Sequence, residues 1–519
     1  MPWTDKQVVV SVIDCGRFDY PRRAPFHPPE AYAEYRYPTC GIDPDNFVYA
    51  AVRELLYELG FDRARFGSAH WNPLREIVRP GDNVIIKPNL VISEHEFGER
   101  GLLACVAHGS VIRPLIDYVL LANEGRGWVT ICDSPIKEVD FAKITEFNGL
   151  TSVCQFFRDQ VGADVRLLDL RDLQVTRNAR GVMVAEQELV GDPLGYTVVD
   201  LGPRSLLAGV AAHNQRFRST AAVYENPMSE AHTETVNLYS MSNTILRADC
   251  LIGVAKLKNH RKCGVTLSLK NMIGTTNEKR WLPHHRVGTP SQGGDICPDE
   301  APPARKIHEV LADKFISHSY GFVGFKYVLP VMQFVYRYAV RWWARPLSAA
   351  RPQADVGEGD WWGNDTIWRT TLDLNMVIRY ADKQGRLHDT PQRAYLSVID
   401  GILGGHREGP LHATAKECGI LVGGLDPVAV DVVCSHMMGF DPERIRLLSD
   451  SHRASLAVGT ADPAMIEVRS NLERWTQWRE PDFEHLAFEP SGGWRGYVER
   501  APHRPLAGGA PTSRPPARV

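Results

Sequence analysis

Six short runs of apolar residues, separated by amphipathic segments, constrain the fold of this chain more than any other feature. Each run is nearly continuous in Val, Ile and Leu, which is typical of strands covered on both faces. Strands of this kind alternating with helices predict an α/β fold, with a mainly parallel or mixed sheet flanked by helices. The predicted strands are residues 83–87, 128–132, 165–169, 250–255, 395–400 and 419–424.

Amphipathic segments with helix-boundary signals lie between these runs. Residues 47–59 have helical periodicity and follow Asp43 and Pro44, a capping residue and a residue favoured at the first helical position. Residues 109–123 predict a crossover helix between the first two strands, and residues 427–438 predict another helix.

The alternation of strands and helices divides the chain into a core and less regular parts. Two stretches, 170–245 and 276–370, are rich in turn-forming residues and predict irregular insertions that cover a site. The predicted divisions are 1–80 as an N-terminal segment packed on the core, 81–470 as the α/β domain, 471–500 as a C-terminal extension and 501–519 as a disordered tail.

One apolar stretch, residues 321–343, is long enough to suggest a membrane span. However, Lys326, Gln333, Arg337 and Arg341 follow one another at spacings that place them on one face of a helix. The segment therefore predicts an amphipathic helix rather than a span. Two interpretations stay open: a helix packed on the protein body, or a basic helix that contacts a membrane surface or a partner protein.

Charge and cysteine content exclude several classes of protein. The formal net charge is −3, so nothing global indicates a nucleic-acid partner. The 10 cysteines include no C-x-x-C pair, and we expect no iron–sulfur cluster. The N-terminus has no signal-peptide pattern. We expect a cytoplasmic protein, peripheral to the inner face of a membrane if residues 321–343 touch one.

Polar side chains follow five of the six predicted strands. Because ligands in open α/β sheets bind beyond the carboxyl ends of the strands, we expect these groups to converge on one site. Ordinary turn and capping chemistry is the alternative, above all for Asp133-Ser134-Pro135 and Asp426-Pro427. The candidate substrate-binding residues at these ends are Lys87, Asn89, Asp133, Ser134, Lys256 and Lys258, and Asp400 ends the fifth strand.

The segment 256–274 carries the densest positive charge in the chain. Its lysines and arginine, with the two glycines that allow close backbone approach, predict a site for a carboxylate or phosphate. A solvated basic loop is the alternative. A desolvated lysine among other cations also has a lowered pKa, which suits a base or nucleophile. The candidate catalytic residues are Lys270, His260, His284 and His285, and Asn271 is a further candidate for substrate binding.

Two further segments carry candidate residues. In residues 361–375, aromatic side chains beside Asn364, Asp365 and Arg369 suit recognition of a sugar or nucleobase, and a helix packed by its own apolar residues is the alternative. Asp400, Glu408 and Asp431 are candidate ligands for a divalent metal such as Mg²⁺ or a partner acid–base pair.

These motifs resemble the DUF362 family over most of residues 80–450. The matching segments are VIIKPNLV (84–91), ADCLIGVAKLKNHRKCGVTLSLKNMIG (248–274), WWGNDTIWRTTLDLN (361–375), SVIDGILGGHREGP (397–410) and DPVAVDVVCSHMMGFDPERI (426–445). Residues 252–284 are also similar in spacing to the active-site region of lactate racemase-type proteins. That similarity implies roles in proton or hydride transfer beside a nickel-pincer cofactor for Lys270, His260 and either His284 or His285.

The sequence therefore predicts an enzyme that acts on a small anionic metabolite, carboxylated or phosphorylated and with or without a linked sugar, using lysine and histidine chemistry at the strand ends. A non-catalytic scaffold that docks through residues 321–343 is one alternative. A racemase or epimerase is the other. Reaction type, metal and oligomeric state are not determined by these patterns.

Overall fold

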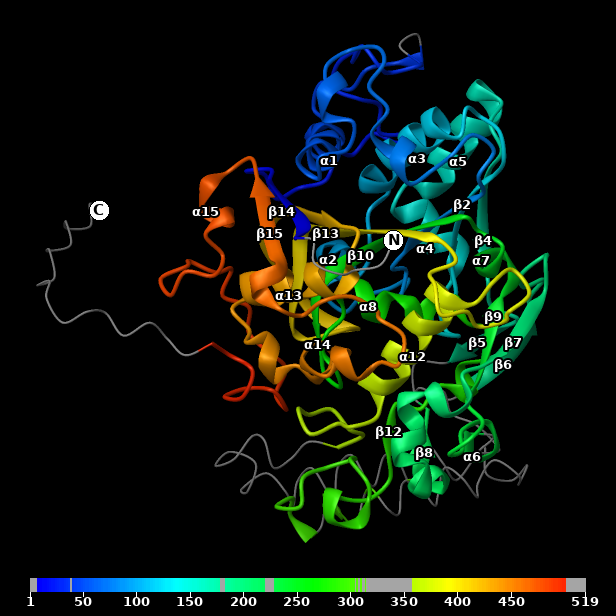
Figure 1. The fold of residues 1–519 in the computed structure, drawn as a ribbon, viewed down its shortest axis with the longest axis vertical. Coiled ribbons are helices and arrows are strands. Elements are labelled where there is room, and N and C mark those ends of the chain that lie inside the picture. The colour runs from blue at the N-terminus through cyan, green and yellow to red at the C-terminus, as the bar shows by residue number, and fades with distance from the viewer. Residues whose placement is uncertain are drawn as a thin grey trace, which may run out of the picture.

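The structure is a computed structural model of the chain (Figure 1). The predicted amphipathic helix at 321–343 and the predicted tail at 501–519 lie outside the described residues, so both stay predictions. The structure describes residues 7–37, 40–177, 183–219, 228–303 and 357–500, with a few single positions between 305 and 313.

A nine-stranded mixed sheet forms the centre of the fold, and all six predicted strands lie in it. The order is β15-β1-β14-β13-β10-β2-β3-β4, and the short β11 (Gly264–Val265) pairs with β10. The strands from β13 to β4 are parallel to one another, as are β1 and β15. Their bounds are β1 (Val8–Asp14), β2 (Val84–Pro88), β3 (Val129–Asp133), β4 (Val165–Asp169), β10 (Cys250–His260), β13 (Ala394–Glu408), β14 (His412–Gly424) and β15 (Ile466–Ser470).

Strand β14 runs against its neighbours, which corrects one expectation from the sequence. It forms a hairpin with β13 and pairs antiparallel with β1 as well. Its last residue, Gly424, therefore lies opposite Ser397 near the start of β13. Asp426, which follows β14, is at the amino-terminal edge of the parallel strands, so it does not join the other strand-end residues.

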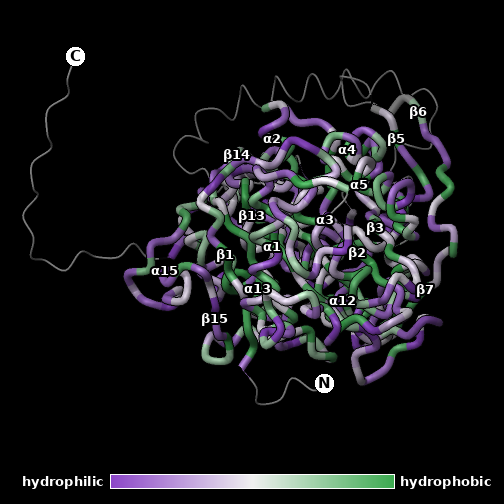
Figure 2. Tube along the Cα trace, turned by 90° about the horizontal axis from the view of Figure 1, so that it is seen from above, coloured by the Kyte–Doolittle hydropathy of each residue, from purple (hydrophilic) through white to green (hydrophobic). Residues whose placement is uncertain are grey.

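Two hydrophobic cores cover the two faces of the sheet. Alternate residues of β10 face opposite ways: Leu251 and Ala255 enter one core, and Ile252 and Val254 enter the other. Figure 1 shows the helices in two groups on either side of the sheet. Figure 2 shows hydrophobic segments running through the middle of the fold. The flanking helices are α1 (Phe47–Glu58), α3 (Gly109–Ala122) and α5 (Leu150–Phe156) on one face, and α8 (Leu267–Asn271), α12 (Ile367–Tyr380) and α13 (Pro427–Met438) on the other.

The helix boundaries follow the predicted signals with one exception. The side chain of Asn46, not Asp43, caps α1 by accepting a hydrogen bond from the backbone N–H of Tyr49 at 3.2 Å. The region Gly98–Ala122, which holds α2 (Gly98–Cys105) and α3, is apolar and long enough to cross a membrane, but 94% of its most apolar window is buried in the fold. These two helices are therefore buried elements of the core.

The segments outside the main sheet form small sheets and caps. Residues 170–245 contain the hairpin of β5 (Leu173–Arg177) and β6 (Met183–Glu188), and the pair β7 (Tyr196–Asp200) and β9 (Leu238–Ser242). At the C-terminal side, Trp475, Trp478 and Trp494 are buried in the core. The N-terminal β1 lies inside the sheet between β14 and β15.

Candidate active site

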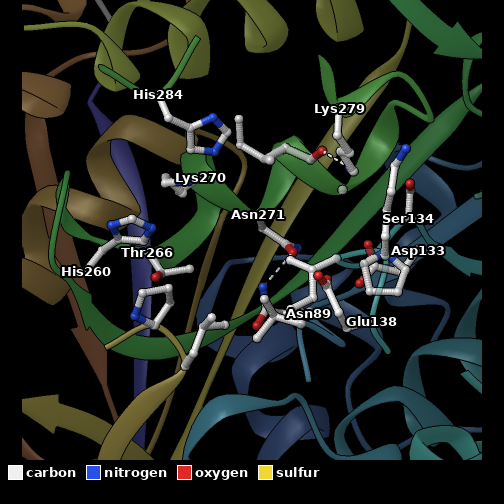
Figure 3. A pocket seen from close by; sticks show the side chains of 18 of the residues that line it. Asn89, Asp133, Ser134, Glu138, His260, Thr266, Lys270, Asn271, Lys279 and His284 are labelled. Atoms are coloured by element: carbon white, nitrogen blue, oxygen red, sulfur yellow. Dashed lines mark hydrogen bonds between the residues drawn. The ribbon is translucent and has the colours of Figure 1, made fainter. Parts of the chain in front are cut away.

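A cavity of about 770 Å³ opens at the carboxyl ends of β2, β3 and β10 (Figure 3). These three strands are parallel neighbours, so their ends meet at one edge of the sheet. After β10 the chain turns through β11 into α8, which returns along the same edge. The cavity is lined by nine of the residues predicted from the sequence: Lys87, Asn89, Asp133, Ser134, Lys258, His260, Lys270, Asn271 and His284.

A buried ion pair forms the floor of the cavity. Lys87 Nζ donates to Asp133 Oδ1 at 2.7 Å, to Asn271 Oδ1 at 3.0 Å and to the carbonyl of Pro88 at 2.8 Å. Asp133 Oδ2 accepts from the backbone N–H of Leu90 at 2.9 Å. All three N–H donors of Lys87 are therefore used by the protein. In this arrangement Lys87 holds the floor together rather than offering a donor to a ligand.

Lys258 lies beside this floor and is held by neutral groups. Its Nζ donates to Asn89 Oδ1 at 2.9 Å and to the carbonyl of Cys105 at 2.6 Å. Burial, together with the positive charges of Lys256 and Lys270, lowers the pKa of Lys258 to about 8. The ammonium group thus has hydrogen-bond acceptors but no carboxylate within ion-pair distance among the described residues.

Lys270 projects from α8, and Asp431 fixes the start of that helix. The two carboxylate oxygens of Asp431 accept from the backbone N–H groups of Ser268 at 2.8 Å and Leu269 at 3.0 Å. Within the described part of the chain, Lys270 Nζ makes no hydrogen bond or ion pair. The side chain is only 7% exposed, and burial lowers its pKa to about 8.

Two of the three histidines that line the cavity in the described part of the chain, His260 and His284, have opposite tautomers. His260 Nδ1 accepts from the backbone N–H of Lys262 at 3.0 Å, which leaves the ring proton on Nε2. His284 Nδ1 donates to the carbonyl of Leu282 at 2.7 Å, which leaves Nε2 with a free lone pair. Burial, followed by the charge of Lys270, lowers the pKa of both imidazoles, that of His284 to about 3.

Figure 3 shows Lys270 between the two imidazoles. Both rings are neutral near pH 7, so His260 offers a hydrogen-bond donor and His284 offers a proton acceptor. His285, the other histidine of the pair, is buried in β12 (His285–Arg286) and does not line the cavity. The structure thus selects His284 from the two neighbouring candidates.

Lys279 and Thr266 line the cavity although the sequence analysis did not single them out. Lys279 Nζ donates to the carbonyl of Ile273 at 2.7 Å, and burial lowers its pKa to about 7. Lys279 falls outside every strand end, in the charged run NEKR, so its sequence looks like a solvated turn. The only sequence feature that could have pointed to Lys279 as a cavity residue is its nearness to the basic segment 256–274. No sequence feature pointed to Thr266.

Lys256 and Asp400 form a separate buried pair outside the cavity. Lys256 Nζ lies 3.2 Å from Asp400 Oδ2, and Tyr20 Oη hydrogen-bonds to both side chains at 2.5 Å. A bulge in the pairing of β10 with β13 explains why Lys256 and Lys258 reach different places. In the register of the two strands Lys256 lies opposite Asp400, whereas Lys258 lies opposite Gly405. The expectation that Lys256 and Asp400 reach the common site is therefore corrected.

The three candidate metal ligands are not brought together. Asp400 pairs with Lys256, Asp431 caps α8, and Glu408 Oε1 accepts from the backbone N–H of Gly492 at 3.0 Å. Across the residues that the structure describes, no group of three or more His, Cys, Asp or Glu side chains is arranged to hold a metal ion. Each of these acids already serves the fold, so the predicted Mg²⁺ site is not formed by them.

The aromatic segment packs as a helix and does not line the cavity. Trp368 and Leu372 are buried in the core on α12, which matches the simpler of the two interpretations. Asp365 forms ion pairs with Arg286, Arg369 and Arg446. Asn364 Nδ2 donates to the carbonyl of His284 at 2.9 Å. This segment therefore holds the backbone of His284 through a hydrogen bond and does not close over the cavity.

The fold and the cavity define an α/β protein with a lysine-rich pocket at the carboxyl ends of parallel strands. The chain belongs to the DUF362 family, whose model, described as a domain of unknown function, matches residues 173–436. That match contains Lys258, His260, Lys270 and His284, whereas β2 and β3 precede it. No curated protein and no solved structure matched the chain. The similarity to lactate racemase-type proteins stays a prediction.

Proposed function

We propose that this protein is an enzyme that binds an organic anion, a carboxylate or a phosphate ester, and transfers a proton on it. The observation that carries the proposal is Lys270, a buried ammonium group that lies in the cavity without an ion-pair partner among the described residues. A buried cation is costly unless a counter-charge balances it. A bound anion supplies that charge.

Three ammonium groups support this assignment. Lys258, Lys270 and Lys279 form no ion pair with any described residue, and burial lowers their pKa values to about 8, 8 and 7. The lowered pKa values reflect the cost of burying positive charge in the cavity. An anion between these groups would restore their charge and gain charge-assisted hydrogen bonds.

The histidines give the site its acid–base chemistry. His284 Nε2 has a lone pair that can accept a proton and, once protonated, return it, and His260 Nε2 carries a proton with which it can donate a hydrogen bond. Lys270 lies between them and stabilises negative charge that develops on the bound molecule. An isomerase is one specific form of this proposal, because a base that takes and returns a proton, beside a hydrogen-bond donor and a cation, suits proton removal and return at one carbon.

Two other expectations remain proposals. A scaffold that docks through residues 321–343 depends on a segment outside the described residues, whereas the cavity gives the enzyme a defined site. A cytoplasmic location suits the ten cysteines, which are all unpaired with one another.

Isothermal titration calorimetry with inorganic phosphate and with acetate tests the binding step. In Lys270→Met the affinity is expected to fall at least roughly tenfold, as for loss of a charge-assisted contact. Lys143→Met is the matched control, because Lys143 is exposed and does not line the cavity. Equal affinity of wild type and Lys270→Met would refute the proposal.

Deuterium exchange tests the proton transfer. Native mass spectrometry of the purified protein identifies the anion that copurifies, and that compound is then incubated with the enzyme in D₂O. Uptake of one deuterium is expected with wild type and with the control His452→Gln, whose side chain is exposed. His284→Gln should abolish the uptake. Exchange that continues unchanged in His284→Gln would exclude His284 as the base.

A further inference from the structure

We infer that the substrate is amphiphilic: an anionic head group joined to a hydrocarbon or aromatic body, rather than a sugar-linked metabolite. The inference rests on the proposed function and adds the chemical class of the substrate. It comes from the half-buried apolar side chains that line the same cavity as the ammonium groups without ion-pair partners among the described residues.

Charged and apolar side chains line the cavity together. Lys258 and His260 extend from β10, Lys270 and Asn271 from α8, and Lys279 and His284 from the segment that follows α8. The apolar side chains come mainly from residues beyond the strand ends, from the hairpin β5–β6 and from the turn between β13 and β14, where Lys137, Glu138, Glu186 and His412 also line the cavity. The apolar wall consists of Val91, Ile136, Leu173, Val175, Ile273 and Leu411.

The apolar wall is incompletely buried. Val91, Ile136, Leu173, Ile273 and Leu411 are all half-buried, although four of them also pack on the two cores. Apolar surface that faces a cavity gains free energy when a hydrocarbon ligand covers it, at about 25 cal/mol per Å². The protein therefore presents an unfilled apolar surface directly beside its unpaired ammonium groups.

The interior amides are not free to recognise sugar hydroxyl groups. Asn271 Oδ1 accepts from Lys87, and its Nδ2 donates to the carbonyl of Lys87 at 3.0 Å. Asn89 Oδ1 accepts from Lys258. A sugar specified by hydrogen bonds needs convergent donors and acceptors that the protein has not already used. These two amides are therefore not available to specify a sugar.

The size of the cavity supports a body larger than the head group. At about 770 Å³ it falls in the size range of pockets that enclose whole cofactors and drug-sized ligands. A phosphate or acetate ion would contact the ammonium groups and leave the apolar wall in water. A molecule that fills the cavity must extend from the lysines toward Leu173 and Leu411.

A chain-length series of carboxylates tests the inference by calorimetry. Acetate, butyrate and hexanoate share one head group and differ only in hydrocarbon. For wild type we expect the affinity to rise by up to about fourfold for each methylene that becomes buried. The heat capacity of binding should also become more negative along the series, which marks apolar burial.

Substitutions on the apolar wall locate the effect. Leu173→Asn and Ile136→Asn should leave acetate affinity within about twofold and reduce the ratio of hexanoate to acetate affinity by roughly threefold or more. Leu472→Asn is the matched control, since Leu472 is 43% exposed and does not line the cavity. Two wall positions are used so that misfolding of one variant does not decide the result.

The outcomes separate this inference from the proposed function. Suppose that acetate binds through Lys270. The amphiphilic substrate is then refuted, while the anion site stands, if the affinity of wild type does not change from acetate to hexanoate. It is also refuted if the affinity rises as steeply along the series in the two wall variants as in wild type. If Lys270→Met leaves acetate binding unchanged, the proposed function itself fails, and the amphiphilic substrate fails with it.

Discussion

Lys87 and Asp133 form an ion pair of 2.7 Å that joins the carboxyl ends of β2 and β3, and both side chains are almost completely buried. The pair is closed by Asn271, which brings the end of α8 to the same point. Three elements that are far apart in sequence are thus fastened at the floor of the cavity. The groups that face the ligand site are positioned by this contact, although neither member of the pair is free to bind a ligand.

The first prediction concerns Asp133→Ala. Removing the carboxylate leaves the buried ammonium of Lys87 without its counter-charge, which costs about 3–5 kcal/mol of unfolding free energy. Urea denaturation followed by circular dichroism measures the loss. Glu94→Ala is the control, since it breaks the exposed Lys143–Glu94 pair, for which about 0–1 kcal/mol is expected. A loss for Asp133→Ala no larger than the control would contradict the structural role assigned to the pair.

The second prediction concerns Gly274, which passes directly beside the same pair. A Cβ at Gly274 would lie 2.1 Å from Asp133 Oδ1 and 2.6 Å from Lys87 Nζ. Its φ of −81° is ordinary, so the requirement for glycine is steric. Gly274→Ala should weaken both phosphate binding and thermal stability. Gly209→Ala is the control, because a Cβ there would lie 3.6 Å from the nearest neighbouring atom, in the side chain of Arg369. It should change neither phosphate binding nor thermal stability. Unaltered phosphate binding in Gly274→Ala would show that the Lys87–Asp133 pair can move without any effect on the anion site.

Much of this arrangement could be predicted from the sequence, for identifiable reasons. Buried parallel strands have continuous apolar runs, so β2, β3 and β10 and the polar residues at their ends were found directly. The basic segment that ends β10 and follows it could also be recognised. Charged side chains among glycine and apolar residues are buried on folding, and burying a charge costs free energy unless a ligand or partner balances it. Those two patterns together placed nine candidates on one cavity.

The errors came from contacts that local patterns do not encode. Strand direction is set by pairing with distant strands, so nothing in ILVGG showed that β14 runs antiparallel and carries Asp426 away. The bulge that sends Lys256 to Asp400 and Lys258 to the cavity depends on extra residues in β13. Lys279 lacks a strand before it, and only the tertiary fold brings it to the cavity.

The third prediction is that Lys270→Met stabilises the protein while it weakens anion binding. The pKa of Lys270 falls from 10.5 to about 8 on folding, so its charged form is disfavoured in the folded state. That difference corresponds to roughly 3 kcal/mol, present in full below pH 8 and relieved as the pH rises from 8 to 10.5. Urea denaturation should therefore show a gain for Lys270→Met at pH 7 that shrinks toward pH 10. A destabilised variant at pH 7 would argue that the ammonium has a partner.

The fourth prediction concerns the pH dependence of acetate binding. Acetate stays ionised above about pH 6, so the protein alone sets the profile there. The ammonium groups of Lys258, Lys270 and Lys279 lose their protons as the pH passes through about 7 to 8 in the empty site. Affinity should be highest at pH 6 to 7 and fall steadily above, with protons taken up from the buffer on binding at pH 8.

A permanently charged side chain at one position provides the control for this profile. Arginine keeps its charge at every pH of the experiment, so Lys270→Arg should retain more of its affinity at pH 9, relative to pH 6.5, than wild type does. Calorimetry in buffers of different ionisation enthalpy measures both the affinity and the proton uptake. An affinity independent of pH from 6.5 to 9 in wild type would mean that these lysines are not the groups that hold the anion, because their charge could not then be changing across that range.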